Sequence, residues 1–70
     1  MRLFQLTNIG SDAAKEPSNS PSEEMKIVYF MARHNDKSTD DQLNMFVVQD
    51  KWRLQKAIRS LKNSKAIIEV

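Results

Sequence analysis

The sequence predicts a single small α+β domain in which one helix packs on one face of a three- to four-stranded mixed sheet. Three observations lead to this fold class. Apolar residues at helical spacing lie within residues 51–62, a β-branched run follows at 66–70, and two apolar runs of strand length precede the helix at 26–33 and 42–48. With a short strand at 1–6, the expected element order over residues 1–70 is βββαβ.

The helix is the best-defined of these elements. Its apolar members recur at i, i+3, i+4 and i+7, which lines one side of an α-helix; they are Leu54, Ala57, Ile58 and Leu61. Asp50 is expected to cap the first turn, and Asn63-Ser64 supplies a turn-forming exit. The predicted helix therefore runs from about Lys51 to Lys62. Its outer side is basic, with Lys51, Arg53, Lys56, Arg59 and Lys62.

The strands are assigned from shorter patterns. Residues 26–33 are apolar on both faces of a strand, which is typical of a central position in a sheet. Residues 42–48 return after a polar turn, which favours antiparallel pairing with 26–33. A strand, helix and strand of this length predict that 66–70 lies parallel to 42–48, with a right-handed crossover. Residues 1–6 are expected at a sheet edge.

Residues 10–24 are expected to form a flexible Ser/Pro-rich loop within the domain. The segment has two prolines, four serines and no large apolar residue. Because nothing in it can join a core, it is predicted to be mobile.

The net charge of +2 conceals a segregation of charge along the chain. Residues 1–50 carry five basic and eight acidic side chains, whereas residues 51–70 carry six basic and one acidic. One face of the fold is therefore expected to be basic.

The composition also limits the class of protein. The chain has no cysteine, so disulfides, thiolate metal ligands and a thiol nucleophile are absent. The longest apolar run, Ile27 to Ala32, is far shorter than the roughly 20 residues that span a bilayer. The chain also begins without a signal-like segment, and we expect an intracellular, cytoplasmic protein.

Enzymatic activity finds little support in the sequence. His34 is the only histidine, and the acids near it lie in a turn whose Asn, Asp and Ser residues already have a conformational role. Gly10 is the only glycine, so the sequence has no glycine-rich phosphate loop. The paired acids at 23–24 and 40–41 are expected to be solvated. We therefore predict a non-enzyme without a catalytic, cofactor or metal site.

Trp52 is the most informative candidate binding residue. A rotation of about 100° per residue places it nearly opposite the apolar stripe, beside Lys56 and Arg59. An exposed tryptophan next to Lys and Arg has the composition of an interaction hot spot. The alternative is that Trp52, in the first helical turn, folds back on the preceding strand or on the long loop.

The sheet supplies a second candidate surface. One sheet face carries the helix and the other has only loops to cover it, so its apolar side chains are expected to contact a partner or a second copy of the chain. The candidates are Val28, Phe30, Phe46 and Ile68. A homodimer through this face or a strand edge is one such arrangement.

The predicted function is that of a small non-catalytic protein-binding module, such as a regulator, inhibitor or assembly adaptor that docks on a larger protein. Its expected partner-binding residues are Trp52, Lys56, Arg59, Phe30 and Phe46. The alternative is a small nucleic-acid-binding protein that uses the basic helix, because positive charge beside a stacking aromatic suits phosphates and bases. Against this alternative, the chain carries nine acids and shows no known nucleic-acid-binding motif.

Two segments resemble a known family of small proteins. The beginning, Met1-Arg2-Leu3-Phe4-Gln5-Leu6-Thr7, and the ending after a helix, Ala66-Ile67-Ile68-Glu69-Val70, resemble the small capping linkers of phycobilisomes, compact β-rich modules with one such helix. The chain has Val48-Gln49-Asp50 in place of a Val-Pro-Tyr sequence before the helix, and Asn63-Ser64 in place of Gly-Gly after it. We therefore do not assign the chain to this family, and the resemblance implies only a non-enzymatic binding role.

We predict that Ile58→Ala and Leu61→Ala each lower the free energy of unfolding by about 2–5 kcal/mol, because each leaves a cavity under the helix. Lys56→Ala and Gln55→Ala, on the outer side, should change it by less than about 0.5 kcal/mol. Chemical denaturation followed by circular dichroism compares the four variants. Silent apolar substitutions would mean that the helix is absent or rotated.

Overall fold

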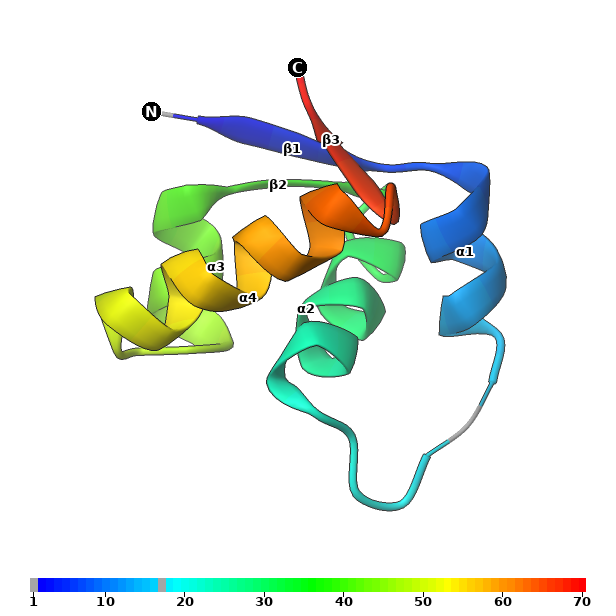
Figure 1. Cartoon of the computed structure of the whole chain (residues 1–70), viewed down its shortest axis with the longest axis horizontal. Helices are drawn as coiled ribbons and strands as arrows, with labels where there is room; N and C mark the ends of the chain where they lie inside the picture. Colours follow the sequence, from blue (N-terminus) through cyan, green and yellow to red (C-terminus); the bar gives the residue numbers. More distant parts are fainter. Residues whose placement is uncertain (1, 17) are drawn as a thin grey trace.

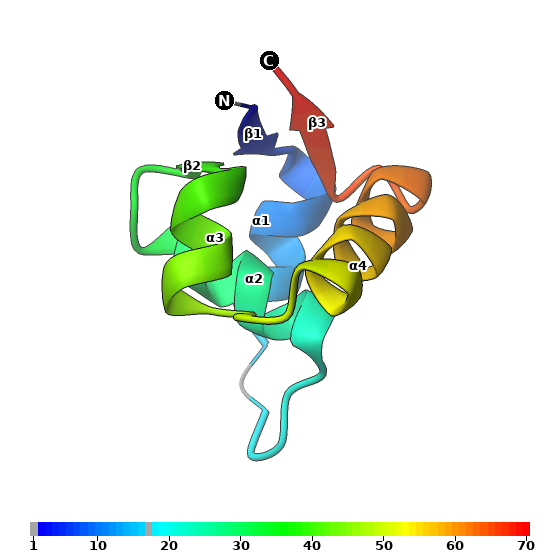
Figure 2. The same cartoon turned by 90° about the vertical axis from the view of Figure 1, so that its left-hand side faces the viewer.

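Figure 1 shows the computed structural model, which describes residues 2–16 and 18–70. The elements within these ranges are β1 (Leu3–Leu6), α1 (Asn8–Ala14), α2 (Glu23–Ala32), β2 (Lys37–Thr39), α3 (Asp40–Phe46), α4 (Lys51–Asn63) and β3 (Ile67–Glu69). The strands form one antiparallel sheet of order β2-β1-β3. The helices lie together on one side of this sheet, with α3 and α4 flanking α2 (Figure 2).

The prediction of one helix on a βββαβ mixed sheet is wrong. The described residues form four helices and a three-stranded antiparallel sheet. The strand predicted at 1–6 exists as β1, but it lies in the centre of the sheet and not at its edge. The strand predicted at 66–70 exists as β3, but it pairs antiparallel with β1, and Phe4 lies opposite Glu69.

Helix α2 occupies the segment that was predicted to be the central strand at 26–33. The Ser22 hydroxyl accepts a hydrogen bond from the Met25 amide at 3.3 Å, and two glutamates stand in the first turn, where the helix dipole favours acids. Met31 lies four residues after Ile27 and three after Val28, and all three are buried. A helix packed at the centre of a domain is apolar around much of its surface, so this run mimics a strand that is buried on both faces.

Helix α3 occupies most of the second mispredicted strand, residues 42–48. The Thr39 hydroxyl accepts from the Gln42 amide at 3.1 Å, and the Gln42 side-chain oxygen accepts from the Thr39 amide at 3.0 Å. This reciprocal pair is a capping box and starts the helix. Within α3 only Leu43 is buried, so the alternating apolar residues belong to a short surface helix.

Helix α4 confirms the helix predicted at 51–62. The Asp50 carboxylate accepts from the amides of Trp52 at 2.9 Å and Arg53 at 3.1 Å, which caps the first turn as expected. At the other end Lys65 adopts a left-handed conformation with φ 64°, and the Ala66 amide donates to the Leu61 carbonyl at 2.9 Å. This Schellman-type ending leads the chain directly into β3.

The core lies between the helices and the sheet. Phe4 and Leu6 of β1 are buried, while the residues that alternate with them are partly exposed. The apolar stripe of α4 faces inward as predicted; its members are Leu54, Ala57, Ile58 and Leu61. Because β1 alternates and α4 follows the helical period, each element contributes one face to the same core.

Thr7 and Gly10 fasten α1 to the turn between α4 and β3. The Thr7 amide donates to the Ala66 carbonyl at 3.0 Å, and the Thr7 hydroxyl accepts from the Gly10 amide at 3.3 Å. A Cβ added at Gly10 would lie 2.2 Å from the Ala66 carbonyl oxygen and 2.8 Å from the Leu6 side chain. This close approach of helix to backbone requires a glycine.

The segment 10–24 contains more structure than the predicted loop. Residues 10–14 belong to α1, and Glu23 and Glu24 to α2. Residues 15–16 and 18–22 are in neither a helix nor a strand. The Tyr29 hydroxyl of α2 donates to the Glu16 carbonyl, which holds one point of this connection. The predicted mobility of the segment 10–24 stays a prediction.

We predict that Gly10→Ala lowers the free energy of unfolding by about 1–3 kcal/mol, because the new methyl group meets backbone that cannot yield. The sign is diagnostic, since Gly→Ala inside an unconstrained helix stabilises by about 0.5–1 kcal/mol. Asn8→Ala, at an exposed position of the same helix, is the matched control and should change stability by less than about 0.5 kcal/mol. Denaturant titration measures both; a stabilised Gly10→Ala protein would disprove the tight contact.

Candidate interaction surface on helix α4

The exposed side of α4 lies opposite its buried stripe. Trp52 is 82% exposed, which confirms the predicted outward orientation of this side chain and excludes a fold back onto the preceding segment. Its backbone is nevertheless well fixed, because its amide is bound by the Asp50 cap. A large aromatic ring is thus held in solvent on a packed helix.

Trp52 lines a shallow groove of about 300 Å³ together with Gln55, Lys56 and Arg59, which we call the Trp52 groove. These four residues stand at i, i+3, i+4 and i+7, so their side chains form one continuous row along the helix. We call this row the outer ridge, and the groove is the hollow between its side chains. The structure therefore brings together Trp52, Lys56 and Arg59, as the sequence predicts. Their role as partner contacts stays a proposal.

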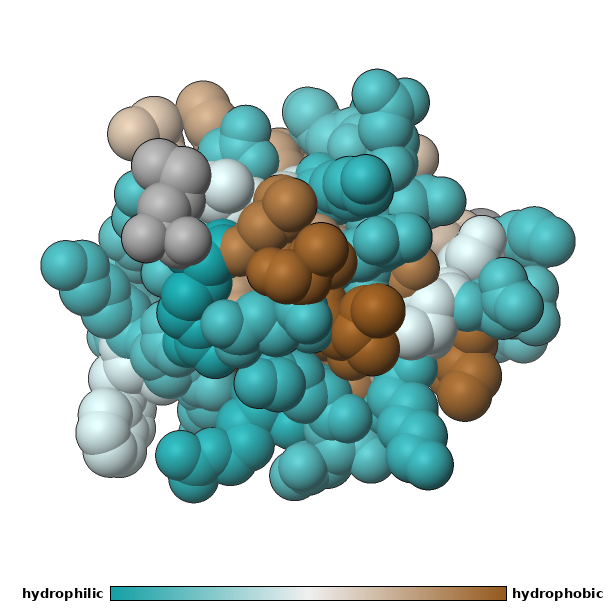
Figure 3. All heavy atoms as spheres, turned by 90° about the horizontal axis from the view of Figure 1, so that it is seen from above, coloured by the Kyte–Doolittle hydropathy of each residue, from teal (hydrophilic) through white to brown (hydrophobic). Residues whose placement is uncertain are grey.

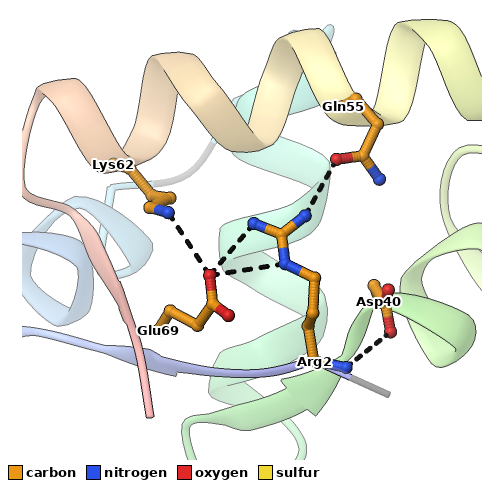
Figure 4. A network of polar contacts seen from close by, with 5 residues as sticks. All are labelled: Arg2, Asp40, Gln55, Lys62 and Glu69. Carbon is orange, nitrogen blue, oxygen red and sulfur yellow. Dashed lines mark hydrogen bonds and ion pairs between the residues drawn. The ribbon is translucent and has the colours of Figure 1, made fainter.

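A polar network lies along α4 beside this ridge, from Gln55 to Lys62 (Figure 4). The Arg2 guanidinium donates to Glu69 Oε1 from Nη2 at 3.0 Å and from Nε at 3.3 Å, and from Nη1 to the Gln55 side-chain oxygen at 3.1 Å. Lys62 reaches the same Glu69 oxygen at 3.4 Å. The network joins the start of β1, the end of β3 and α4.

The electrostatics of this network favour the charged forms of its members. The hydrogen bond from Arg2 lowers the pKa of the Glu69 carboxyl below its ordinary value of 4.5 against a smaller opposing effect of desolvation, and Lys62 adds to the lowering. The same contact with Glu69 raises the pKa of Arg2. Both partners are partly exposed, with 38% and 40% of their side-chain surfaces open to solvent, so the pair is weak as a source of stability.

A second groove, of about 330 Å³, continues the first. We call it the Arg2 groove; its lining residues are Arg2, Gln55, Ile58, Arg59, Lys62 and Asn63. Gln55 and Arg59 line both grooves, so the two hollows adjoin along α4. The combined surface runs over most of the length of this helix.

The cations of α4 differ in how far they are neutralised. Arg53 pairs with Glu23 at 3.0 Å, and Lys62 shares Glu69 with Arg2. Lys56 and Arg59 make no ion pair with any residue in the ranges 2–16 and 18–70. The positive charge beside Trp52 is therefore available to another molecule.

Phe30 and Phe46 are not among the residues that line the Trp52 groove or form the polar network beside it (Figure 4). They belong to a separate aromatic cluster. Their rings stack at 6.1 Å between centroids, and Phe30 also stacks on His34 at 4.1 Å. Both phenylalanines lie on helices, α2 and α3, so their expected position on an open sheet face is wrong, and so is that of Val28, which is buried in α2. The expectation fails because it rests on the two mispredicted strands.

Within the part of the chain that the structure describes, the sheet has one face that no helix covers (Figure 1), and Ile68 lies on it as expected. Figure 3 views the molecule from the sheet side and shows a group of hydrophobic atoms among hydrophilic ones. Ile68 is 50% exposed on β3, Val70 follows it, and Leu3 of β1 is partly exposed. Contact of this face with a partner or with a second copy of the chain stays a prediction.

Other kinds of site find no support in the described ranges. No group of three or more His, Cys, Asp or Glu side chains gathers there as a metal site needs. None of the helices found in those ranges combines the length and apolar character required to cross a bilayer. No family model matches the chain, and neither the curated proteins nor the solved structures contain a significant match to it.

Sequence reasoning missed Arg2 and Asn63 as members of the surface. Asn63 continues the outer ridge four residues after Arg59, so helical spacing extended by one step would have included it. Arg2 carries no such signal. It reaches α4 only because β1 is central and Arg2 lies on the same face as Phe4, whose ring it covers at 5.0 Å.

We predict that Glu69→Gln lowers the melting temperature at pH 7 and that its difference from the wild type disappears on acidification. Because the pKa of Glu69 is lowered by folding, its contribution to stability is complete above the unfolded value of 4.5 and is lost as the pH falls through the lower folded value. Melting curves from pH 7 downward test this. Glu16→Gln, an exposed acid outside the network, is the control; an equal difference at every pH for Glu69→Gln would contradict the prediction.

Proposed function

We propose that the protein is a non-catalytic protein-binding module that docks on a larger protein through the exposed side of α4. The observation that carries this proposal is Trp52, 82% exposed in a groove that it shares with Lys56 and Arg59. Tryptophan and arginine are the residues most enriched among interface hot spots. A regulator, inhibitor or assembly adaptor in the cytoplasm would use such a surface.

The rigidity of the surface supports this role. The groove lies on a capped helix whose opposite side is buried in the core, so its side chains start from fixed backbone positions. Binding then costs little ordering of the backbone, and this preorganisation favours affinity. The aromatic cluster of Phe30 and Phe46 is a second contact region in the proposal, and pairing with a second copy would use the open sheet face around Ile68.

Nucleic-acid binding is the second candidate function. Lys56 and Arg59, which have no ion-pair partner within residues 2–16 and 18–70, lie on the same side of α4 as the exposed Trp52, and this combination suits phosphate contacts and base stacking. The neutralisation of Arg53 by Glu23 and the contact of Lys62 with Glu69 reduce this charge, which makes a protein partner the better-supported proposal.

We predict that affinity capture from source cells recovers a protein partner with the tagged wild type, and that Trp52→Ala and Arg59→Ala each reduce its recovery about tenfold or more. Lys37→Ala, an exposed cation on β2 outside both grooves, should leave recovery unchanged. Quantitative mass spectrometry with and without nuclease makes the measurement. Equal capture by all variants would contradict the proposal, and a nuclease-sensitive capture that weakens steeply with salt would favour nucleic acid.

A further inference from the structure

Resting on the proposed function, we infer that the surface formed by the two grooves binds an extended acidic peptide segment that carries an apolar residue at one end. The apolar side chain lies against Trp52, and the carboxylates lie along Arg59 and in the Arg2 groove. The partner is thus a protein with an exposed acidic tail or loop of this composition.

The dimensions suit a short extended segment. The ridge from Trp52 to Asn63 spans about 16 Å at the helical rise of 1.5 Å per residue. An extended chain covers that distance in about five residues at roughly 3.3 Å each. The two grooves share Gln55 and Arg59, so such a segment meets one unbroken surface.

Charge complementarity identifies the segment as acidic. Among the described residues, none that lines either groove is an acid. Lys56 and Arg59 lack an ion pair in the part of the chain that the structure describes, and Arg2 and Lys62 both contact a single oxygen of Glu69. Arg2 and Lys62 thus share one carboxylate and Arg59 between the grooves has none within residues 2–16 and 18–70, so the positive charge along this surface favours an anionic partner.

The division of the surface sets the order of the partner's residues. The Trp52 groove is lined by the indole ring and by long side chains whose stems are apolar, so it accepts an apolar side chain. The Arg2 groove offers the guanidinium groups of Arg2 and Arg59 and the ammonium group of Lys62, so it accepts carboxylates. Between them the Gln55 side-chain oxygen is occupied by Arg2, which leaves the amide nitrogen to donate to a peptide carbonyl.

The test uses synthetic peptides and the fluorescence of Trp52, the only tryptophan of the chain. The probes are the acetylated peptide Leu-Ser-Gly-Asp-Glu-Asp, its reverse sequence, a version with Gly in place of Leu, and a version with Asn and Gln in place of the acids. We expect a saturable blue shift with one of the first two peptides. The Gly and the neutral versions should bind about tenfold more weakly or worse.

Two variants with the same change in net charge locate the site. Arg59→Glu should weaken binding of the acidic peptide about tenfold or more, whereas Lys37→Glu, outside both grooves, should alter it less than about twofold. Circular dichroism verifies that both variants are folded. Equal binding by both variants, or an unchanged emission with all peptides, would overturn the inference.

The outcomes for the inference and for the proposed function are distinguishable. If no peptide binds but Trp52→Ala abolishes capture of a protein partner, the proposed function stands and the acidic-segment inference falls. If a ten-nucleotide oligo(dT) shifts the Trp52 emission more strongly than any peptide, with affinity linear in the logarithm of salt, both fall.

Discussion

Burial of the apolar stripe of α4 fixes the rotation of this helix about its own axis, and the proposed binding surface depends on that rotation. Leu54 and Ile58 are each 1% exposed, so the helix cannot turn without removing them from the core. Trp52 and Arg59 are therefore directed outward by packing on the other side of the helix. The apolar stripe therefore both packs the core and determines which side chains of α4 face solvent. Inside the domain, α4 packs against α2 and β3.

Arg2 extends this surface by a different principle. Its position depends on tertiary pairing: β1 lies between β2 and β3, which places Arg2 next to Glu69 of the last strand and Gln55 of α4. One side chain therefore links three elements from opposite ends of the chain (Figure 4). Because these contacts are partly exposed, they orient the groove more than they stabilise the fold.

The sequence alone was sufficient to predict α4, because its N-cap, its apolar stripe and its C-terminal turn residues all indicate the same helix. The outward position of Trp52 and its basic neighbours then follows from helical geometry. It was misleading at 26–33 and 42–48. There the apolar pattern favours strands, whereas Ser22 with its two glutamates and the Thr39 and Gln42 pair begin helices. Short apolar runs fit either structure, so the capping residues were the more reliable signal. The contact of Gly10 with Ala66 and the reach of Arg2 depend on tertiary pairing that no local pattern encodes.

The sheet order also determines when the fold can close. Phe4 of the central strand pairs with Ser38 on one side and with Glu69 on the other, so its second partner is separated from it by nearly the whole chain. Pairing β1 with β3 closes a long loop, at an entropic cost that rises slowly with loop length, whereas the helices form from neighbouring residues. During synthesis β1 is made before the other described elements, and one of its edges stays unpaired until β3 has been made. The central strand can pair with β2 early but with β3 only at the end, and until then its second edge is an unpaired strand edge of the kind at which aggregation begins.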